Sequence, residues 1–285
     1  MAEDTKGWEL VAENLSFPEG PAWDFKGALY FSNCKGGYIT KVDSTGAKVF
    51  LRADDDPFTF EKTNGMTFGK DGALYACDFG RGAILRIEIG GASTVYAGGF
   101  ADKRFSTTND LAFDPQGNLW FSDPKSHGKE MEKGDGRLFR RRADTGEVEL
   151  MRTALHFPNG LCFTADGKTL YLAESALSRV LKFAVHEDGS LSEPKVFAEL
   201  PHSDPDGMAL DVEGNLYVAH FGGGCVRVYA PDGTEREVIE VPGQNVSNVE
   251  FAGDDLRTLY VTECKENKVW RRQMDVPGLK LHWSP

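Results

Sequence analysis

Apolar and polar residues alternate in short segments along the chain, and one arrangement of them returns six times. In its clearest copy a polar residue, Asn159, stands between proline and glycine and opens a short apolar strand. An Asp-Gly turn then leads to a second strand that ends on Glu174. The six equivalent opening residues, called anchors below, lie 42 to 50 residues apart and are Glu19, Asn64, Asn109, Asn159, Asp206 and Asn248. A repeat of about 40 to 50 residues with short strands and glycine turns is typical of β-propellers. The pattern therefore predicts an all-β fold, a six-bladed β-propeller with four antiparallel strands per blade.

Each copy continues with the same landmarks. Eight residues after each of the first five anchors stands a glycine, and all six copies then carry leucine followed by an aromatic residue. Fourteen or fifteen residues after each anchor comes a second polar group, called the strand-end residue below: Asn33, Asp78, Asp123, Glu174, His220 and Glu263. These landmarks predict strands at 28–32, 38–42 and 48–51 in the first blade, and at 66–68, 74–77, 83–89 and 94–97 in the second.

The two ends of the chain bear on how the ring closes. Residues 8–15 alternate apolar and polar ahead of the first anchor, while the sixth copy is one outer strand short. We expect this segment to supply the outermost strand of the last blade and so close the ring; a frayed N-terminal arm is the alternative. A closed ring makes residues 1–285 one domain. The tail, 275–285, is expected to pack along the base of the ring.

The longest insertion, residues 123–135, lies between the second and third strands of blade three. Its mixture of Lys, Glu, Gly and His fits either a flap over a pocket or a solvated excursion, and both interpretations stay open.

Composition narrows the functional classes. The net charge is −12, which disfavours nucleic acid and anionic membrane surfaces as partners, because both need a basic footprint. The N-terminus has no apolar signal core, so we expect a cytoplasmic protein that acts as a monomer or weak homodimer. Five scattered cysteines without a C-x-x-C pair fit reduced thiols. Cys77 stands where other copies have small residues; a core role fits it better than a catalytic one.

The anchors are the candidate chemistry. The first strand of each blade lines the channel of a propeller, so the anchors should form a ring of two carboxylates and four amides. Crowded carboxylates need a cation or shared protons, and oxygen-rich sets suit Ca²⁺ or Mg²⁺ ahead of Zn²⁺. Three anchors occur as Pro-x-Gly, which fixes a side chain in place: Glu19, Asn159 and Asp206. For Asn64 and Asn248, simple turn or strand-end roles are equally consistent.

The strand-end residues suggest support rather than direct chemistry. Asp123 and His220 could hold metal ligands by hydrogen bonds, whereas strand-end hydrogen bonding is the plainer account of Asn33 and Asp78. Among the histidines, His127 and His220 are the candidates for a site. The sequence has no G-x-S-x-G, P-loop or dinucleotide motif, which disfavours a serine hydrolase, an NTPase or a Rossmann enzyme.

At these residues the sequence resembles the gluconolactonase, regucalcin (senescence marker protein) and luciferin-regenerating enzyme family of six-bladed propellers. The likeness spans nearly the whole chain, and its motifs are the segments at 18–23, 108–111, 121–124, 157–160 and 205–208. It implies one divalent ion, Ca²⁺ by preference with Zn²⁺, Mg²⁺, Mn²⁺ or Fe²⁺ as alternatives, bound by Glu19, Asn159 and Asp206. It also implies sugar-lactone hydrolysis, with Asp206 transferring a proton and Asn109 facing the substrate.

One departure from the family pattern concerns substrate recognition. Family members acting on aldonolactones commonly carry arginine two residues before the asparagine, where this chain has Thr107. The nearest arginine, Arg104, would have to reach in from its loop. Thr107, Arg104 and His127 are therefore the expected substrate contacts beside Asn109, and the natural substrate could be a less ordinary lactone.

These observations favour metal-assisted opening of a lactone ring, with sugar lactones as the expected substrates. The ion would act as a Lewis acid on the lactone carbonyl and lower the pKa of a water, Asp206 would accept the proton of that water, and Asn109 would hydrogen-bond the substrate. An organophosphate or ester hydrolase with the same metal cup and a metal-binding propeller without turnover are the alternatives.

Overall fold

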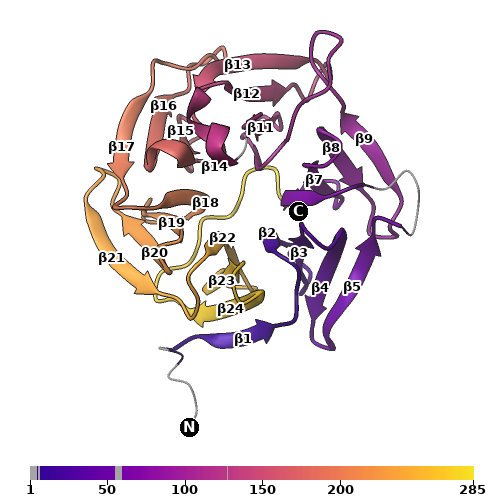
Figure 1. Ribbon diagram of the computed structural model, residues 1–285, viewed down its shortest axis with the longest axis vertical. Coiled ribbons are helices and arrows are strands. Elements are labelled where there is room, and N and C mark those ends of the chain that lie inside the picture. The colour runs from indigo at the N-terminus through magenta and orange to yellow at the C-terminus, as the bar shows by residue number, and fades with distance from the viewer. Residues whose placement is uncertain (1–4, 6, 55–59, 127) are drawn as a thin grey trace.

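The computed structural model describes residues 5, 7–54, 60–126 and 128–285. In this part of the chain, twenty-four strands form six four-stranded antiparallel sheets arranged around a central axis (Figure 1). Within each sheet the strands run in order from the axis outward, and the anchors lie on or just before the innermost strand. The predicted six-bladed propeller is confirmed.

The first three blades are continuous in sequence. Blade one contains β2 (Pro18–Trp23), β3 (Leu29–Asn33), β4 (Tyr38–Asp43) and β5 (Gly46–Arg52). Blade two contains β6 (Thr63–Phe68), β7 (Leu74–Asp78), β8 (Ala83–Ile87) and β9 (Ser93–Ala97). Blade three contains β10 (Leu111–Phe113), β11 (Leu119–Asp123), β12 (Gly136–Arg141) and β13 (Val148–Leu155), with the 3-10 helix η1 (Gly128–Lys133) between β11 and β12.

The last three blades repeat this plan. Blade four contains β14 (Pro158–Phe163), β15 (Thr169–Glu174), β16 (Arg179–Ala184) and β17 (Lys195–Glu199), with the 3-10 helix η2 (Ser175–Leu177) after β15. Blade five contains β18 (Asp204–Leu210), β19 (Leu216–Phe221), β20 (Cys225–Tyr229) and β21 (Glu235–Glu240). Blade six contains β22 (Val246–Ala252), β23 (Thr258–Glu263), β24 (Lys268–Gln273) and, from the other end of the chain, β1 (Glu9–Ala12).

The ring is closed by the N-terminal strand, as predicted. β1 pairs antiparallel with β24, so Glu9 lies opposite Arg271 and Leu10 opposite Trp270. Just ahead of β1, the buried indole of Trp8 donates a hydrogen bond to the carbonyl of Glu240, 2.7 Å away in blade five. β24 is therefore paired on both sides, and blade six has four strands like the other blades.

The core lies between blades rather than within them. Among the described residues, the buried apolar side chains form six clusters, one at each interface between neighbouring blades. The aromatic residue of each Leu-aromatic pair explains part of this packing: Tyr30 meets Phe68 of the next blade at a centroid distance of 5.2 Å, and Tyr75 meets Phe113 at 5.1 Å. These edge-to-face contacts hold each blade at a fixed angle to the next.

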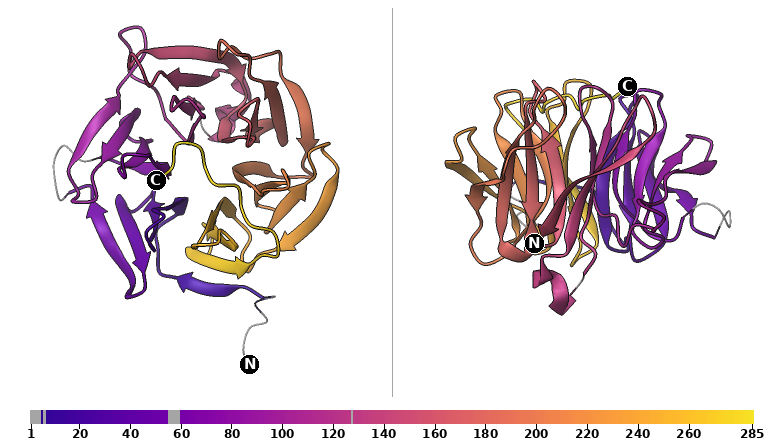
Figure 2. Two further views of the ribbon diagram at one scale, coloured as in Figure 1. Left: turned by 180° about the vertical axis from the view of Figure 1, so that it is seen from behind. Right: turned by 90° about the horizontal axis from the view of Figure 1, so that it is seen from above.

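The two faces of the ring differ. η1 projects from one face, whereas the C-terminus lies toward the opposite face (Figure 2). The tail does more than pack along the base, because it runs across the axis (Figure 1). The amide of Leu279 donates to the carbonyl of Leu210 at 2.7 Å, and His282 Nε2 bonds the carbonyl of Thr164 at 2.8 Å. In the described chain, no helix has the length and apolar character required to cross a bilayer.

Candidate functional site

Five of the six anchors lie around one cavity on the axis of the ring. The cavity has a volume of about 410 Å³, within the range of about 300–1,000 Å³ that is usual for small-molecule sites. Met131 of η1 also lines it, which places the cavity at the η1 face. The anchors in its lining are buried, and we call them the floor: Glu19, Asn64, Asn109, Asn159 and Asp206.

Each anchor sits at an irregularity of its innermost strand. In five blades the pairing register shifts at or next to the anchor, for example between Glu19 and Ala22 in β2 and between Pro158 and Leu161 in β14. In blade three, β10 begins only at Leu111, after its anchor. Such bulges redirect side chains and are frequent beside functional sites. The bulges therefore explain how the anchors, at the start of the innermost strands, turn their side chains toward the cavity.

Glycines after the anchors allow neighbouring innermost strands to approach closely. A Cβ atom at Gly20 would lie 2.2 Å from the carbonyl oxygen of Asn64, and one at Gly160 would lie 2.3 Å from the carbonyl oxygen of Asp206. No side chain fits at these distances. The glycine of the Pro-x-Gly segments therefore brings the next blade's anchor toward the same point.

The floor concentrates negative charge. Burial raises the pKa of Glu19 well above its usual range, and the carboxylates of Asp206 and Asp110 raise it further. Burial, followed by the charges of Asp110 and Asp204, raises the pKa of Asp206 in the same way. In the described chain Glu19 Oε2 is buried without a hydrogen-bond partner. A cation at this point would stabilise both carboxylates, because it offsets burial and mutual repulsion together.

The neutral members of the floor are held by hydrogen bonds. The Asn159 side-chain amide donates to the hydroxyl of Ser175 at 3.3 Å, and that hydroxyl donates to the carbonyl of Pro205 at 2.7 Å. This arrangement leaves Asn159 Oδ1 as an oxygen for the cavity. The backbone of Asn109 is fixed from both sides, since its N–H donates to Ser122 and its carbonyl accepts from Gly65.

The donor set fits a hard divalent cation. Glu19, Asn159 and Asp206 offer carboxylate and amide oxygens, which Ca²⁺ and Mg²⁺ prefer, and one of these oxygens is an orphaned buried acceptor. The described residues hold no cluster of three or more His, Cys, Asp or Glu side chains arranged for a metal. The expected set contains only two carboxylates, and its third ligand is the amide oxygen of Asn159, so it does not form a cluster of that type.

The strand-end residues position the cavity rim. The side chain of Asn33 accepts from the amide of Ser16 at 3.0 Å, and Glu174 accepts from the amide of His156 at 2.8 Å. In both cases the donor stands three residues before the anchor. Asp78, Asp123 and Glu263 bond the equivalent segments. Asp123 therefore supports the backbone of Ser106 and Thr107 rather than the side chain of a floor residue.

The predicted substrate contacts are only partly brought together. Asn109 lies in the floor, but Thr107 is not among the residues that line the cavity. Arg104 is exposed and lines a separate hollow with Glu61 and Arg81. His127 lies outside the described residues.

Two further predicted members of the site also lie elsewhere. Asn248 faces the opposite end of the axis, where it lines a different hollow. His220 accepts a hydrogen bond from Arg227 Nε at 3.1 Å, and burial, aided by that guanidinium, lowers its pKa to about 4. It is a buried neutral histidine of blade five.

Sequence reasoning missed the side walls of the cavity. Four phenylalanines and one methionine line it and are called the wall below: Phe17, Phe79, Met131, Phe157 and Phe221. A third carboxylate, Asp204, lines it as well, and burial raises the pKa of Asp204. Most of these residues occupy one of two repeat positions, either two residues before an anchor or one residue after a strand-end residue. Aligning the six copies identifies these two positions but not their role, because other blades carry Lys62 and Ser175 there.

Cysteine chemistry is disfavoured at this cavity. Cys34 is in the lining, but burial raises the pKa of its thiol to about 12, so the nucleophilic thiolate is scarce near neutral pH. All five cysteines are free and buried, which agrees with the expectation of reduced thiols.

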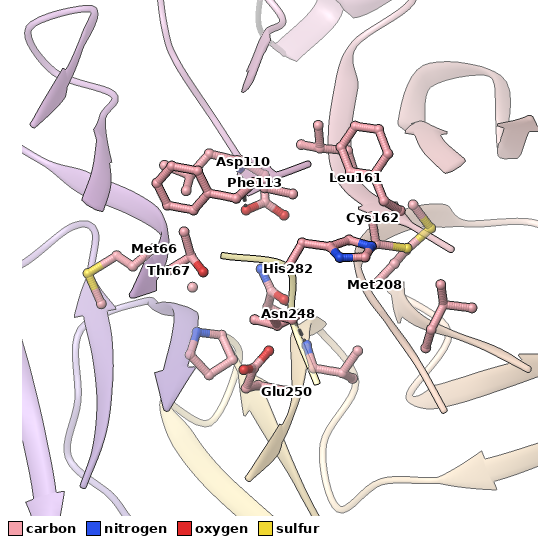
Figure 3. A pocket seen from close by; sticks show the side chains of 18 of the residues that line it. Met66, Thr67, Asp110, Phe113, Leu161, Cys162, Met208, Asn248, Glu250 and His282 are labelled. Atoms are coloured by element: carbon pink, nitrogen blue, oxygen red, sulfur yellow. Dashed lines mark hydrogen bonds between the residues drawn. The ribbon is translucent and has the colours of Figure 1, made fainter. Parts of the chain in front are cut away.

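A second hollow lies at the other end of the axis, under the C-terminal tail (Figure 3). Asp110, Asn248, Glu250 and His282 surround it, but its volume is only about 60 Å³. That space suits a few water molecules rather than a substrate. Of the two hollows, the larger cavity with the carboxylate floor is therefore the candidate site. The tail lines the smaller hollow and not the larger one.

Comparison with known proteins places the chain among relatives of the same architecture. The family model described as "SMP-30/Gluconolactonase/LRE-like region" matches residues 17–265. The chain is 34% identical to the pentonolactonase XacC of Haloferax volcanii over 261 residues, which cover 89% of this chain and 83% of that protein. It is 26% identical to the diisopropyl-fluorophosphatase of Loligo vulgaris, covering 95% of this chain and 93% of that protein.

A solved structure shows the same likeness in three dimensions. A gluconolactonase from Xanthomonas campestris superimposes with a TM-score of 0.82 at 26% identity, over 95% of this chain and 89% of the other. The matched family region begins at Phe17 of the wall and extends past Glu263, so it includes all six anchors. The chain therefore belongs to the SMP-30/gluconolactonase/LRE-like family.

Proposed function

We propose that the protein is a divalent-metal-dependent lactonase, which opens a lactone ring to the hydroxy acid. The observation that carries this proposal is the buried floor, where Glu19, with an unpartnered carboxylate oxygen, shares one cavity with Asn159 and Asp206. Family membership and the relatives named as lactonases support the same reaction and make sugar lactones the first substrates to test.

In this proposal each residue of the floor has a separate role. Glu19, Asn159 and Asp206 would hold the ion, which when bound supplies Lewis acidity toward the lactone carbonyl. Asp206 takes the proton of the attacking water and passes it to the ring oxygen that leaves as an alcohol. Asn109 donates its side-chain amide to the substrate carbonyl oxygen and stabilises the charge that develops there.

The test is acid release from a panel of aldonolactones, followed with a pH indicator. The protein is first stripped with a chelator and then reloaded separately with Ca²⁺, Mg²⁺, Mn²⁺ or Zn²⁺. We expect activity that disappears on stripping and returns with at least one of these ions. The variant Asp206→Asn is assayed in the same way, and Asp232→Asn is its matched control. Asp232 is an exposed turn residue of blade five, so its substitution removes a carboxylate of the same type outside the cavity. Equal rates with and without chelator would contradict the proposal.

A second candidate is hydrolysis of organophosphates by the same floor. Its support is the similarity to a diisopropyl-fluorophosphatase together with the apolar wall, which could accommodate alkoxy groups. Fluoride release from a dialkyl fluorophosphate, measured beside lactone hydrolysis on the same metal-loaded preparation, decides between the two. The ratio of the two kcat/KM values identifies the preferred reaction.

A further inference from the structure

Building on the proposed lactonase reaction, we propose that the preferred substrate carries a hydrocarbon substituent on its lactone ring. The ring carbonyl lies at the floor, and the alkyl or aryl group lies against the wall. This names a substrate class different from the polyhydroxylated sugar lactones that the relatives' names suggest.

The wall is assembled from five separate blades. Phe17 and Phe157 stand two residues before the anchors of blades one and four, whereas Phe79 and Phe221 follow the strand-end residues of blades two and five. Blade three contributes Met131 from η1. All five side chains are partly exposed within the cavity lining. The four rings and the methionine side chain are therefore partly open to the cavity above the floor.

Two of these rings are presented on unusual backbone. Phe17 has φ 60° and Phe157 has φ 54°, in the left-handed region that bulky residues avoid. Both precede a proline, and the side chains of Asn33 and Glu174 hold the amide immediately before each of them. Backbone strain of this kind persists where the surrounding structure imposes it and is concentrated at functional sites. The same device therefore sets the aromatic wall on two sides of the cavity.

Two polar side chains of the lining, Ser175 and Lys35, are engaged by neighbouring groups, while Lys62 and Asp204 line the cavity as well. The Ser175 hydroxyl is used by Asn159 and Pro205. Lys35 Nζ lies 4.1 Å from the ring centroid of Phe17, so its charge rests on an aromatic face. Hydroxyl groups of a sugar placed against the rings would lose water without gaining a hydrogen bond from the rings, which costs binding free energy. A hydrocarbon group in the same place gains by leaving water.

The first measurement is a chain-length series on the metal-loaded protein. δ-Lactones carrying unbranched alkyl groups from methyl to heptyl are compared with glucono-δ-lactone. Each methylene that enters the wall should raise kcat/KM about fourfold, the value for one fully buried methylene. A flat series, or faster hydrolysis of the sugar lactone than of every alkyl lactone, would overturn the inference while leaving the lactonase proposal intact.

Substitutions then assign the effect to the wall. Phe79→Ser and Phe221→Ser should flatten the chain-length dependence, so that the kcat/KM of the heptyl lactone falls much further than that of glucono-δ-lactone, which gains little from the rings. Phe50→Ser is the matched control, since Phe50 is a half-buried phenylalanine on outer strand β5 that does not line the cavity. An unchanged dependence in both wall variants, with melting curves showing folded protein, would contradict the inference.

Binding of non-hydrolysable δ-lactams with the same alkyl groups separates the two proposals. Calorimetry on the wild type should show affinity rising with chain length, and Phe79→Ser and Phe221→Ser should remove the rise. This result stands even if no lactone is turned over, in which case only the lactonase proposal fails. Lactam affinity that is independent of chain length would overturn the inference whatever the activity.

Discussion

At the scale of single residues, Asp206 combines two tasks that can be separated experimentally. It lies in the floor beside Glu19 and Asn159, and its carboxylate is both a candidate metal ligand and the candidate proton acceptor. Its pKa is raised first by burial and then by Asp110 and Asp204. A bound cation favours the ionised form of the same group. The state of this carboxylate is thus coupled to the presence of the ion.

Asp206→Asn should lower lactone hydrolysis by about 10²- to 10⁴-fold, the usual contribution of a general base. The substitution is nearly isosteric, so the fold should persist, while metal affinity should also fall because an amide is a weaker ligand for a hard cation. Activity is measured over a metal titration, and we expect incomplete recovery at saturation. Full recovery would make Asp206 a ligand only. Asn248→Ala, outside the cavity, should cost much less.

The floor could be predicted from the sequence because its residues repeat with the blades, and the Pro-x-Gly segments single out three of them. The wall could not, because the two positions that build it carry different residue types in different blades. Lys62 occupies the position of Phe17, and Ser175 that of Phe79. Arg104 is the nearest arginine to Asn109 in sequence, but it lines a separate hollow in the structure.

At the scale of elements, the distance between neighbouring innermost strands sets the geometry of the floor. Gly160 of β14 touches the backbone of Asp206 in β18 so closely that a Cβ would lie 2.3 Å from its carbonyl oxygen. The atoms of β18 that a Cβ would meet belong to the backbone, so they cannot move aside by a change of side-chain rotamer. Any side chain at this position must separate two blades.

Gly160→Ala should therefore lower the free energy of unfolding by about 1–3 kcal/mol, the usual cost of overpacking. It should also weaken metal binding, because it displaces Asp206 from Asn159. Urea denaturation and metal titration by calorimetry measure the two effects. Gly90→Ala is the control, since a Cβ at Gly90 meets nothing within 4 Å. Native metal affinity in Gly160→Ala would show that the floor tolerates a wider separation.

Closure of the ring by β1 leads to a separate prediction. Deleting the first fifteen residues should lower stability by several kcal/mol, because it exposes the edge of β24 and removes buried Trp8. Trp8→Ala alone should cost about 3–5 kcal/mol. Leu10→Ala is the control on the same strand, where the side chain is 45% exposed. Thermal melts of the three variants provide the comparison, and an unchanged melting temperature after the deletion would refute the role of β1.

The strands were predictable because glycine, leucine and an aromatic residue mark the same turn and strand in nearly every copy. The closing strand followed from the missing outer strand of the sixth copy. The short helix η1 was not predicted, because it lies within an insertion that has no counterpart in the other blades. Its Met131 nevertheless reaches the cavity, which favours the interpretation of this insertion as a cover for the pocket.

At the scale of the whole molecule, buried acids accumulate along the axis. Burial raises the pKa of Asp110 to about 7. Burial, with the charge of Asp110 second, raises the pKa of Glu250 to about 8. Both groups titrate near pH 4 in an unfolded chain. The folded protein therefore holds more protons than the unfolded chain between about pH 4 and pH 8, and its stability falls as pH rises through that window.

In the presence of chelator, the melting temperature should decrease between about pH 6.5 and pH 8.5. This range lies above the window in which His220, neutral in the folded protein, acts in the opposite direction. Glu250→Gln should flatten the decrease, whereas Glu13→Gln, at an exposed position after β1, should not. A melting temperature that rises across this range would contradict the prediction, because it would mean that ionisation of Asp110 and Glu250 does not destabilise the folded protein.

The pairing of β1 with β24 also has a consequence for biosynthesis. The ribosome releases Glu9–Ala12 long before Lys268–Gln273, yet these two strands are hydrogen-bonded neighbours. Until β24 has been synthesised, β1 has no strand to pair with and the nascent propeller stays open between blades six and one. A polypeptide truncated before residue 268 keeps that gap open and offers it to chaperones and proteases. Pairing of β1 with β24 thus marks a completed propeller, and a copy without β24 remains recognisable to cellular quality control.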